Sequence, residues 1–216
     1  MEYPPCVEID PEGTARYSVI WLHGLGADGN DFVPLLPELR IPADRGVRFV
    51  FPNAPMMPVT VNNGYVMPAW YDIHAMELLA RIDVDGILRS ADYLLKLVND
   101  EMARGMAPEN ILLAGFSQGG VIALTAALRT DLPLAGVLAL STYLPRAVPL
   151  GSSPARAIFQ AHGRVDDVVP PQAAMDARAR LEEMGHEVTW REYDMAHSLC
   201  AEEVGDMREW MLQKLG

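Results

Sequence analysis

A G-x-S-x-G pattern spans residues 115–119, with Ser117 at its centre. The apolar run 111–114 before it predicts a buried strand, and the run 121–128 after it predicts a helix. Between a strand and a helix, this pattern is typical of a nucleophile elbow, a sharp turn that exposes the serine hydroxyl. Side chains at Gly115 and Gly119 would crowd such a turn. The alternative is an ordinary strand-to-helix loop whose serine caps the helix.

The elbow predicts an acid and then a histidine further along the chain. His197 follows the alternating segment 188–193, so it falls at the carboxyl end of a predicted strand, where parallel sheets build their sites. His186 stands at a predicted helix end beside a glycine, which favours a solvated side chain. His162 precedes the candidate acids and would give the wrong chain order. We therefore predict that His197 is the base.

Two adjacent carboxylates, Asp166 and Asp167, follow the apolar segment 157–161. Neighbouring residues point in different directions, so only one of the two can easily face His197. The other is then solvated or caps the helix predicted from Pro171. Periodicity does not choose between the two aspartates.

Several spaced motifs together resemble the bacterial carboxylesterase and acyl-protein thioesterase family of α/β hydrolases. They are His23-Gly24-Leu25-Gly26-Ala27-Asp28, Val59-Thr60-Val61-Asn62-Asn63-Gly64, Trp70-Tyr71-Asp72, the elbow with Gly120, His162-Gly163-x-x-Asp166-x-Val168-Val169-Pro170 and Met195-Ala196-His197. The match covers roughly residues 16–212. The resemblance implies a catalytic triad of Ser117, Asp166 and His197. At position 167 the family commonly has proline, whereas this chain has aspartate.

Acyl transfer also requires two backbone N–H donors for the oxyanion that develops in the transition state. One comes from the residue after the nucleophile, here Gln118. The other comes from a loop after an early strand, predicted here over residues 17–22, and the resemblance implies Leu25 as that donor. We interpret His23 as a core histidine, with support of the oxyanion loop as the alternative.

Regular elements alternate along the chain and predict a mostly parallel α/β sheet with helices on both faces. We expect one α/β-hydrolase domain over residues 1–216. The predicted strands are 16–22, 47–52, 111–116, 134–141, 157–162 and 188–194, with a short edge strand at 6–10. The predicted helices are 30–40, 83–104, 118–129, 171–184 and 198–214.

Residues 53–80 break this alternation and show no clean period. An irregular segment of this length is uncommon in a compact domain unless it is functional. By family analogy we interpret it as an apolar acyl-binding wall or partial lid, with Met67, Trp70 and Ile73 as candidate substrate-binding residues. The alternative is a packed surface loop whose aromatic side chains join the core.

Composition limits the choice of partners. The formal net charge of −12 disfavours nucleic acid, and the longest apolar runs have the length of strands rather than of membrane spans. The start of the chain does not read as a signal peptide, and two isolated cysteines fit a reducing compartment, so we expect a cytoplasmic protein. No motif indicates a metal or another cofactor. We expect a monomer or a homodimer.

Together these features predict a serine carboxylesterase that cleaves esters or thioesters of short-to-medium acyl chains through an acyl-enzyme. A lysophospholipase or an acyl-protein thioesterase with the same triad is an alternative. A catalytically silent, hydrolase-like binding protein is the alternative from another class.

Overall fold

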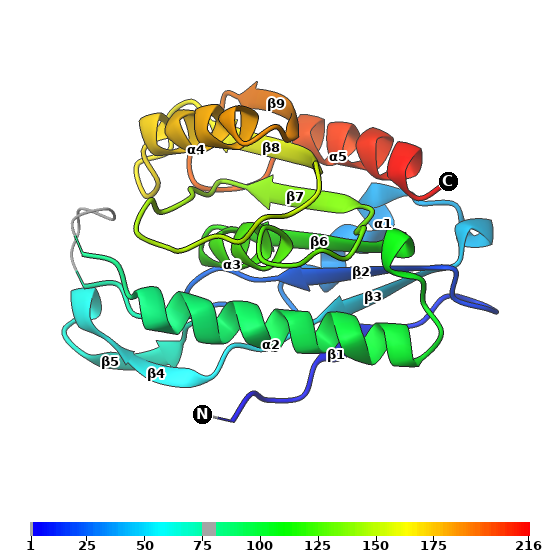
Figure 1. Ribbon diagram of the computed structural model, residues 1–216, viewed down its shortest axis with the longest axis horizontal. Coiled ribbons are helices and arrows are strands. Elements are labelled where there is room, and N and C mark those ends of the chain that lie inside the picture. The colour runs from blue at the N-terminus through cyan, green and yellow to red at the C-terminus, as the bar shows by residue number, and fades with distance from the viewer. Residues whose placement is uncertain (1, 75–80) are drawn as a thin grey trace.

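The computed structural model describes residues 2–74 and 81–216 and contains a seven-stranded sheet (Figure 1). The strand order is β1-β3-β2-β6-β7-β8-β9, and only β1, at one edge, pairs antiparallel. The strands are β1 (Val7–Ile9), β2 (Tyr17–Leu22), β3 (Val47–Phe51), β6 (Ile111–Phe116), β7 (Gly136–Leu140), β8 (Ala157–Gly163) and β9 (Glu187–Tyr193). Because β2, β6, β7, β8 and β9 run in the same direction, the loops that follow them lie at one edge of the sheet.

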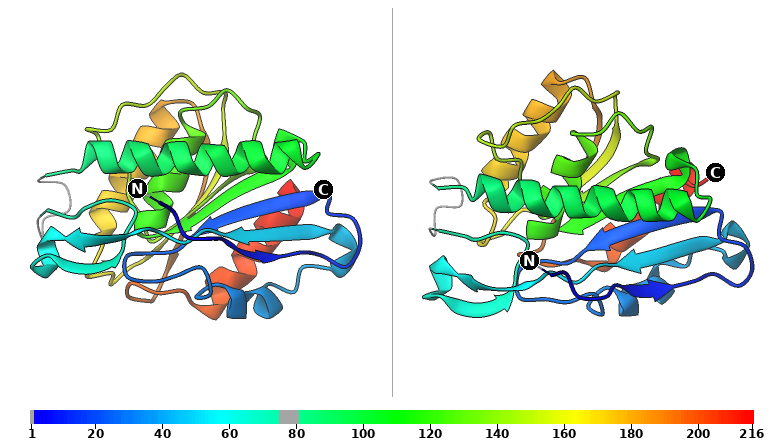
Figure 2. Two further views of the ribbon diagram at one scale, coloured as in Figure 1. Left: turned by 90° about the horizontal axis from the view of Figure 1, so that it is seen from below. Right: turned by 60° about the horizontal axis from the view of Figure 1, so that its bottom comes forward.

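Helices cover both faces of the sheet, as Figure 2 shows. On one face lie α2 (Val84–Ala103), α3 (Gln118–Ala127) and α4 (Pro171–Glu183). On the other lie the one-turn α1 (Leu36–Leu39) and α5 (Ala201–Lys214). Every residue of α3 is buried, because α3 lies between the sheet and α2. This explains why its sequence is apolar on all sides rather than amphipathic.

The predicted strands agree with the observed strands to within two residues at each end, and the mostly parallel sheet is confirmed. The helix predicted over 30–40 is confirmed only in part, over residues 33–39. These residues form a 3₁₀ turn (Val33–Leu35) followed by α1, in a stretch interrupted by Pro34 and Pro37. The last helix begins at Ala201 rather than at 198, which leaves His197 on a loop.

Residues 53–80 are less irregular than the sequence analysis predicts. A hairpin forms from β4 (Met56–Val59) and β5 (Tyr65–Pro68), joined by a turn in which Asn63 and Gly64 have φ of 55° and 74°. In Figure 1 this hairpin lies at the end of the molecule toward which the parallel strands point. Residues 75–80 of the predicted segment lie outside the described residues. Within 2–74 and 81–216, no helix has both the length and the apolar character needed to cross a bilayer.

Candidate active site

Ser117 occupies the turn between β6 and α3 in a strained conformation, with φ of 53° and ψ of −118°. L-residues rarely adopt positive φ, so the surrounding contacts must hold this geometry in place. The Ser117 amide donates to the carbonyl of Leu140 at 2.9 Å, and the Ser117 carbonyl accepts from the hydroxyl of Thr142 at 2.7 Å. Both partners belong to β7 or the loop that follows it. The neighbouring strand therefore fixes the turn on both sides of the serine.

The two glycines of the pattern are required for steric reasons. A Cβ atom at Gly115 would lie 2.2 Å from the carbonyl oxygen of Gly119. A Cβ atom at Gly119 would lie 2.4 Å from the carbonyl oxygen of Leu22, at the end of β2. Both distances are far shorter than a van der Waals contact. The start of α3 thus packs directly on the backbone of β2 and β6, as expected for a nucleophile elbow.

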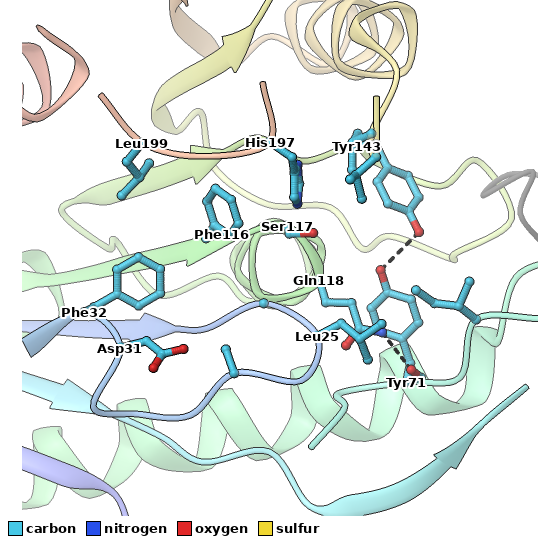
Figure 3. A pocket seen from close by; sticks show the side chains of 15 residues that line it. Leu25, Asp31, Phe32, Tyr71, Phe116, Ser117, Gln118, Tyr143, His197 and Leu199 are labelled. Atoms are coloured by element: carbon cyan, nitrogen blue, oxygen red, sulfur yellow. Dashed lines mark hydrogen bonds between the residues drawn. The ribbon is translucent and has the colours of Figure 1, made fainter. Parts of the chain in front are cut away.

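His197 lies on the loop between β9 and α5 and is held by Asp166. Its Nδ1 is 2.7 Å from Oδ2 of Asp166, whose side chain is fully buried. The other carboxylate oxygen, Oδ1, accepts the amide hydrogens of Val168 and Val169 at 2.9 and 2.8 Å. The His197 ring also packs against Phe116, with ring centroids 4.8 Å apart. Figure 3 shows the imidazole pointing toward the hydroxyl of Ser117.

Asp167 does not share this position, because its side chain is exposed to solvent. The structure thus brings Asp166, and not its neighbour, to His197. His162 lies behind the carboxylate and is buried, with Nε2 at 2.8 Å from the carbonyl of Val169 and 3.4 Å from Oδ2 of Asp166. Burial lowers the pKa of His162, which favours a neutral ring that donates from Nε2.

The prediction that His186 is solvated is wrong. Its side chain is buried at the end of α4, where Nδ1 accepts the amide hydrogen of Arg156 at 3.2 Å. Burial lowers the pKa of this ring as well. The glycine beside it ends the helix as expected, but the following turn folds His186 inward against β8.

The two predicted oxyanion donors, Leu25 and Gln118, both line the cavity in front of Ser117. Gln118 is the first residue of α3, so its amide has no acceptor within the helix. Leu25 lies on the turn after β2, and the next amide, of Gly26, donates to the carbonyl of Pro68 at 2.9 Å. This hydrogen bond ties the turn to β5. The two amides belong to segments that meet at the elbow.

His23 is completely buried under this turn. Its Nδ1 lies 2.7 Å from the carbonyl of Gly24, and its Nε2 accepts the amide hydrogen of Ala54 at 3.1 Å. These bonds correspond to one neutral tautomer, with the proton on Nδ1. Burial lowers the pKa of the ring in agreement with a neutral form. His23 is therefore a core histidine that also braces the loop carrying Leu25, so both interpretations made from the sequence apply.

Gln118 has a second role, which its side chain performs. Its side-chain oxygen accepts the amide hydrogen of Trp70 at 3.1 Å, and its side-chain nitrogen donates to the carbonyl of Tyr71 at 2.8 Å. The amide group thus fastens the segment after β5 to the start of α3. No motif in the sequence signals this contact, because it joins residues about fifty positions apart through backbone atoms.

A cavity of about 430 Å³ opens in front of Ser117 and His197 (Figure 3). Its side chains are mainly apolar or aromatic. The lining residues are Gly24, Leu25, Ala27, Asp31, Phe32, Tyr71, Ile73, Phe116, Ser117, Gln118, Tyr143, Val168, Val169, His197 and Leu199. Of the three predicted substrate-binding residues, Ile73 belongs to this lining, whereas Met67 and Trp70 do not.

Trp70 is the clearest correction. Its indole is buried, and Nε1 donates to the carbonyl of His23 at 2.8 Å. A buried indole satisfies its N–H wherever an acceptor is available, and here that acceptor lies in the core rather than in the cavity. Met67 lies on β5, and its sulfur lies close to Gly26. In the described part of the chain, no group of three or more His, Cys, Asp or Glu side chains is arranged to hold a metal ion.

The strand order and the turn at Ser117 define an α/β-hydrolase fold. Solved structures support this assignment. SOBER1 of Arabidopsis thaliana superposes with a TM-score of 0.86 at 29% identity, over 94% of this chain and 100% of that chain. The acyl-protein thioesterase 2 of Zea mays superposes with a TM-score of 0.82 at 25% identity, over 99% of this chain and 100% of that chain.

A family model described as Phospholipase/Carboxylesterase matches residues 6–215. The acyl-protein thioesterase 1 of Emericella nidulans is 36% identical over 90% of this chain and 88% of its own length. The protein of the same name from Neurospora crassa is 34% identical over 92% of this chain and 86% of its own length. The chain belongs to the phospholipase/carboxylesterase family of α/β hydrolases and is a serine hydrolase.

Proposed function

We propose that the protein is a carboxylesterase whose catalytic triad consists of Ser117, Asp166 and His197. The observation that carries this proposal is the 2.7 Å contact between Asp166 and His197, on a histidine whose ring points at a serine held at positive φ. With Nδ1 donating to the carboxylate, Nε2 of His197 is the nitrogen that accepts the serine proton. The arrangement performs nucleophilic acyl transfer.

In the first half of the reaction, Ser117 Oγ attacks the carbonyl carbon of an ester or thioester while His197 takes its proton. Asp166 keeps the imidazole oriented and stabilises its cationic form. The negative charge that forms on the carbonyl oxygen is bound by the amides of Leu25 and Gln118. Collapse of the tetrahedral intermediate releases the alcohol or thiol, which receives the proton from His197, and leaves the acyl group on Ser117.

In the second half, His197 removes a proton from water, which attacks the acyl-enzyme and releases the carboxylic acid. The same two amides bind the second oxyanion. The apolar cavity favours short-to-medium acyl chains, because each methylene group removed from water contributes about 0.8 kcal/mol. The names of the fungal relatives support thioesters as substrates beside oxygen esters. We also propose that residues 1–216 form one domain and that the enzyme acts in the cytoplasm.

The test is replacement of the nucleophile. Ser117→Ala should lower kcat/KM for p-nitrophenyl butanoate by at least about 10⁴-fold. A fluorophosphonate probe should label Ser117 of the parent enzyme, as peptide mass spectrometry would show. The control variant is Ser152→Ala, which changes an exposed serine and should keep full activity and labelling. Labelling that persists in folded Ser117→Ala would exclude the assignment, and a parent enzyme without hydrolytic activity would favour the silent binding protein.

A further inference from the structure

Away from the proposed catalytic groups, two tyrosines stand in the mainly apolar lining of the cavity. Tyr71 follows β5 and Tyr143 follows β7, and both line the cavity in front of Ser117. Their hydroxyl oxygens lie 3.1 Å apart, at hydrogen-bond distance. The two residues are only 2% and 3% exposed. A pair of phenols enclosed to this degree is normally hydrogen-bonded in full.

This pair leaves one hydrogen atom unused. Each phenol carries one O–H, and a single contact between two hydroxyl groups consumes only one of the two donors. Among residues 2–74 and 81–216, neither hydroxyl makes any other hydrogen bond. Within the described part of the chain, the second donor is therefore free for a molecule that enters the cavity.

The geometry allows the free hydrogen on either hydroxyl. Burial raises the pKa of both tyrosines. In their mutual hydrogen bond, either hydroxyl can be the donor. Asp83 adds negative charge near Tyr71, which disfavours an anionic ligand at this position.

The pair is also displaced from the apolar part of the cavity. In Figure 3 the two phenol oxygens lie on one side of Ser117, whereas Phe32, Phe116 and Leu199 lie on the other side. The side with Phe32, Phe116 and Leu199 offers only hydrocarbon contacts apart from Asp31 at its exposed margin. A substrate that spans the serine would thus meet hydrocarbon on one side of its scissile bond and a hydrogen-bond donor on the other.

We propose that Tyr71 and Tyr143 form a specificity-determining subsite that binds an uncharged acceptor oxygen of the substrate, such as a ketone, ether or hydroxyl oxygen near the scissile ester. This inference rests on the proposed esterase function. It narrows the substrate class to esters or thioesters with a second, neutral oxygen. The oxygen belongs either to the acyl chain or to the leaving group, and the two locations can be separated by experiment.

The experiment compares esters matched in shape that differ in one oxygen. For the acyl side, the pairs are p-nitrophenyl 3-methoxypropanoate with pentanoate and 4-oxopentanoate with 4-methylpentanoate. For the leaving-group side, the pair is the 2-methoxyethyl and butyl esters of one acid. The quantity measured is the ratio of kcat/KM for the oxygenated ester to that for its hydrocarbon partner. Because each ratio is taken within one protein, intrinsic ester reactivity cancels between parent and variant.

In the double variant Tyr71→Phe/Tyr143→Phe, the ratio should fall about 3- to 10-fold below that of the parent, the range expected for loss of one neutral hydrogen bond. The fall should occur for either the acyl pairs or the leaving-group pair, which locates the oxygen. Because Tyr143→Phe and Tyr71→Phe each keep one phenol hydroxyl, each single variant should lower the ratio less than the double variant does. A succinate monoester has a carboxylate in place of the neutral oxygen. In the parent, its kcat/KM should not exceed that of the 4-methylpentanoate ester of the same alcohol.

The matched control is Tyr93→Phe, which removes a phenol oxygen that contacts Cys6 Sγ at 3.7 Å and does not line the cavity. It should leave every ratio unchanged. The subsite is excluded if the double variant and both single variants keep the parent ratios for all pairs. That result would not affect the proposed esterase, because hydrolysis of the hydrocarbon esters and its loss in Ser117→Ala test the triad independently.

Discussion

The carboxylate of Asp166 contacts Nδ1 of His197 through one oxygen and the backbone of its own loop through the other. The loop after β8 thus folds around the side chain that it presents. Because two amide hydrogens fix Oδ1, the carboxylate has no freedom to rotate away from the imidazole. The neighbouring Asp167, one residue later, points into solvent.

This contact predicts different effects for the two aspartates. Asp166→Asn should lower kcat on the order of 10⁴-fold, because the orientation and tautomer of His197 depend on the carboxylate. Asp167→Asn should change kcat by less than about threefold, as is usual for a surface substitution remote from the chemistry. Steady-state kinetics with p-nitrophenyl butanoate, and circular dichroism to confirm folding, would measure both effects. Losses in the reverse order would move the acid to position 167.

The cavity predicts a dependence on acyl-chain length. From acetyl upward, kcat/KM should rise about fourfold for each methylene group that the cavity takes from water, then level off. Phe32→Ala and Leu199→Ala should flatten this rise, because both side chains line the apolar side of the cavity. Met67→Ala is the control, since Met67 is outside the lining. Equal rates for acetyl and octanoyl esters in the parent would show that the cavity does not bind the acyl chain.

The side chain of Gln118 predicts a stability effect separate from catalysis. Gln118→Leu removes the partners of the Trp70 amide and the Tyr71 carbonyl, and each buried group left unpaired costs about 1–3 kcal/mol. The free energy of unfolding, measured with urea, should therefore fall by a few kcal/mol. Gln172→Leu, at an exposed position of α4, should change it by less than about 0.5 kcal/mol. Equal stability of the two variants would show that the hydrogen bonds of the Gln118 side chain do not contribute to the free energy of unfolding.

Glu203 predicts a pH dependence of stability. Its carboxyl group is completely buried in α5. Desolvation is the main cause that raises its pKa from 4.5 to about 8, with a smaller raising effect from Asp206 and an opposing effect from the Cys200 amide. The folded protein therefore binds this proton more tightly than the unfolded chain does. The free energy of unfolding should fall between pH 4.5 and 8, by up to about 1.4 kcal/mol for each pH unit.

Glu203→Gln tests this prediction, because glutamine has a similar shape and does not ionise. The variant should lose the decline between pH 4.5 and 8, and it should be more stable than the parent above pH 8. Glu202→Gln, at the exposed neighbouring position, is the control and should follow the parent curve. Urea denaturation at several pH values would show the difference. Parallel curves for the parent and Glu203→Gln would mean that Glu203 does not titrate in this range.

Most of the sheet could be predicted because its strands carry unambiguous patterns. Central strands such as β6 and β7 are continuous apolar runs, which parallel strands covered on both faces require. The elbow could be predicted for a similar reason, since the backbone approach at Gly115 and Gly119 permits only glycine. In both cases local sequence and tertiary structure impose the same constraint.

The hairpin between β4 and β5 was missed because Pro58 and Pro68 obscure its strands. The dipeptide Asn63-Gly64, a common hairpin signal, was available to predict it. The residues that line the cavity could not be predicted from the sequence for a different reason. Phe32, Tyr143 and Leu199 come from three separate loops, and their convergence depends on tertiary packing that no spacing rule encodes. Trp70 illustrates the same limit, because only the fold shows that its N–H reaches His23.

The contrast between Ser117 and the cavity wall has a consequence for engineering. Ser117 is held in place by close backbone contacts among β2, β6 and α3. These contacts leave no room for a side chain at Gly115 or Gly119. Part of the wall is built from side chains outside these elements, among them Phe32, Ile73 and Leu199. Reactivity and selectivity are thus encoded by different parts of the chain. A library randomised at Phe32, Ile73 and Leu199 could therefore alter which esters are cleaved, while every variant keeps the same catalytic groups.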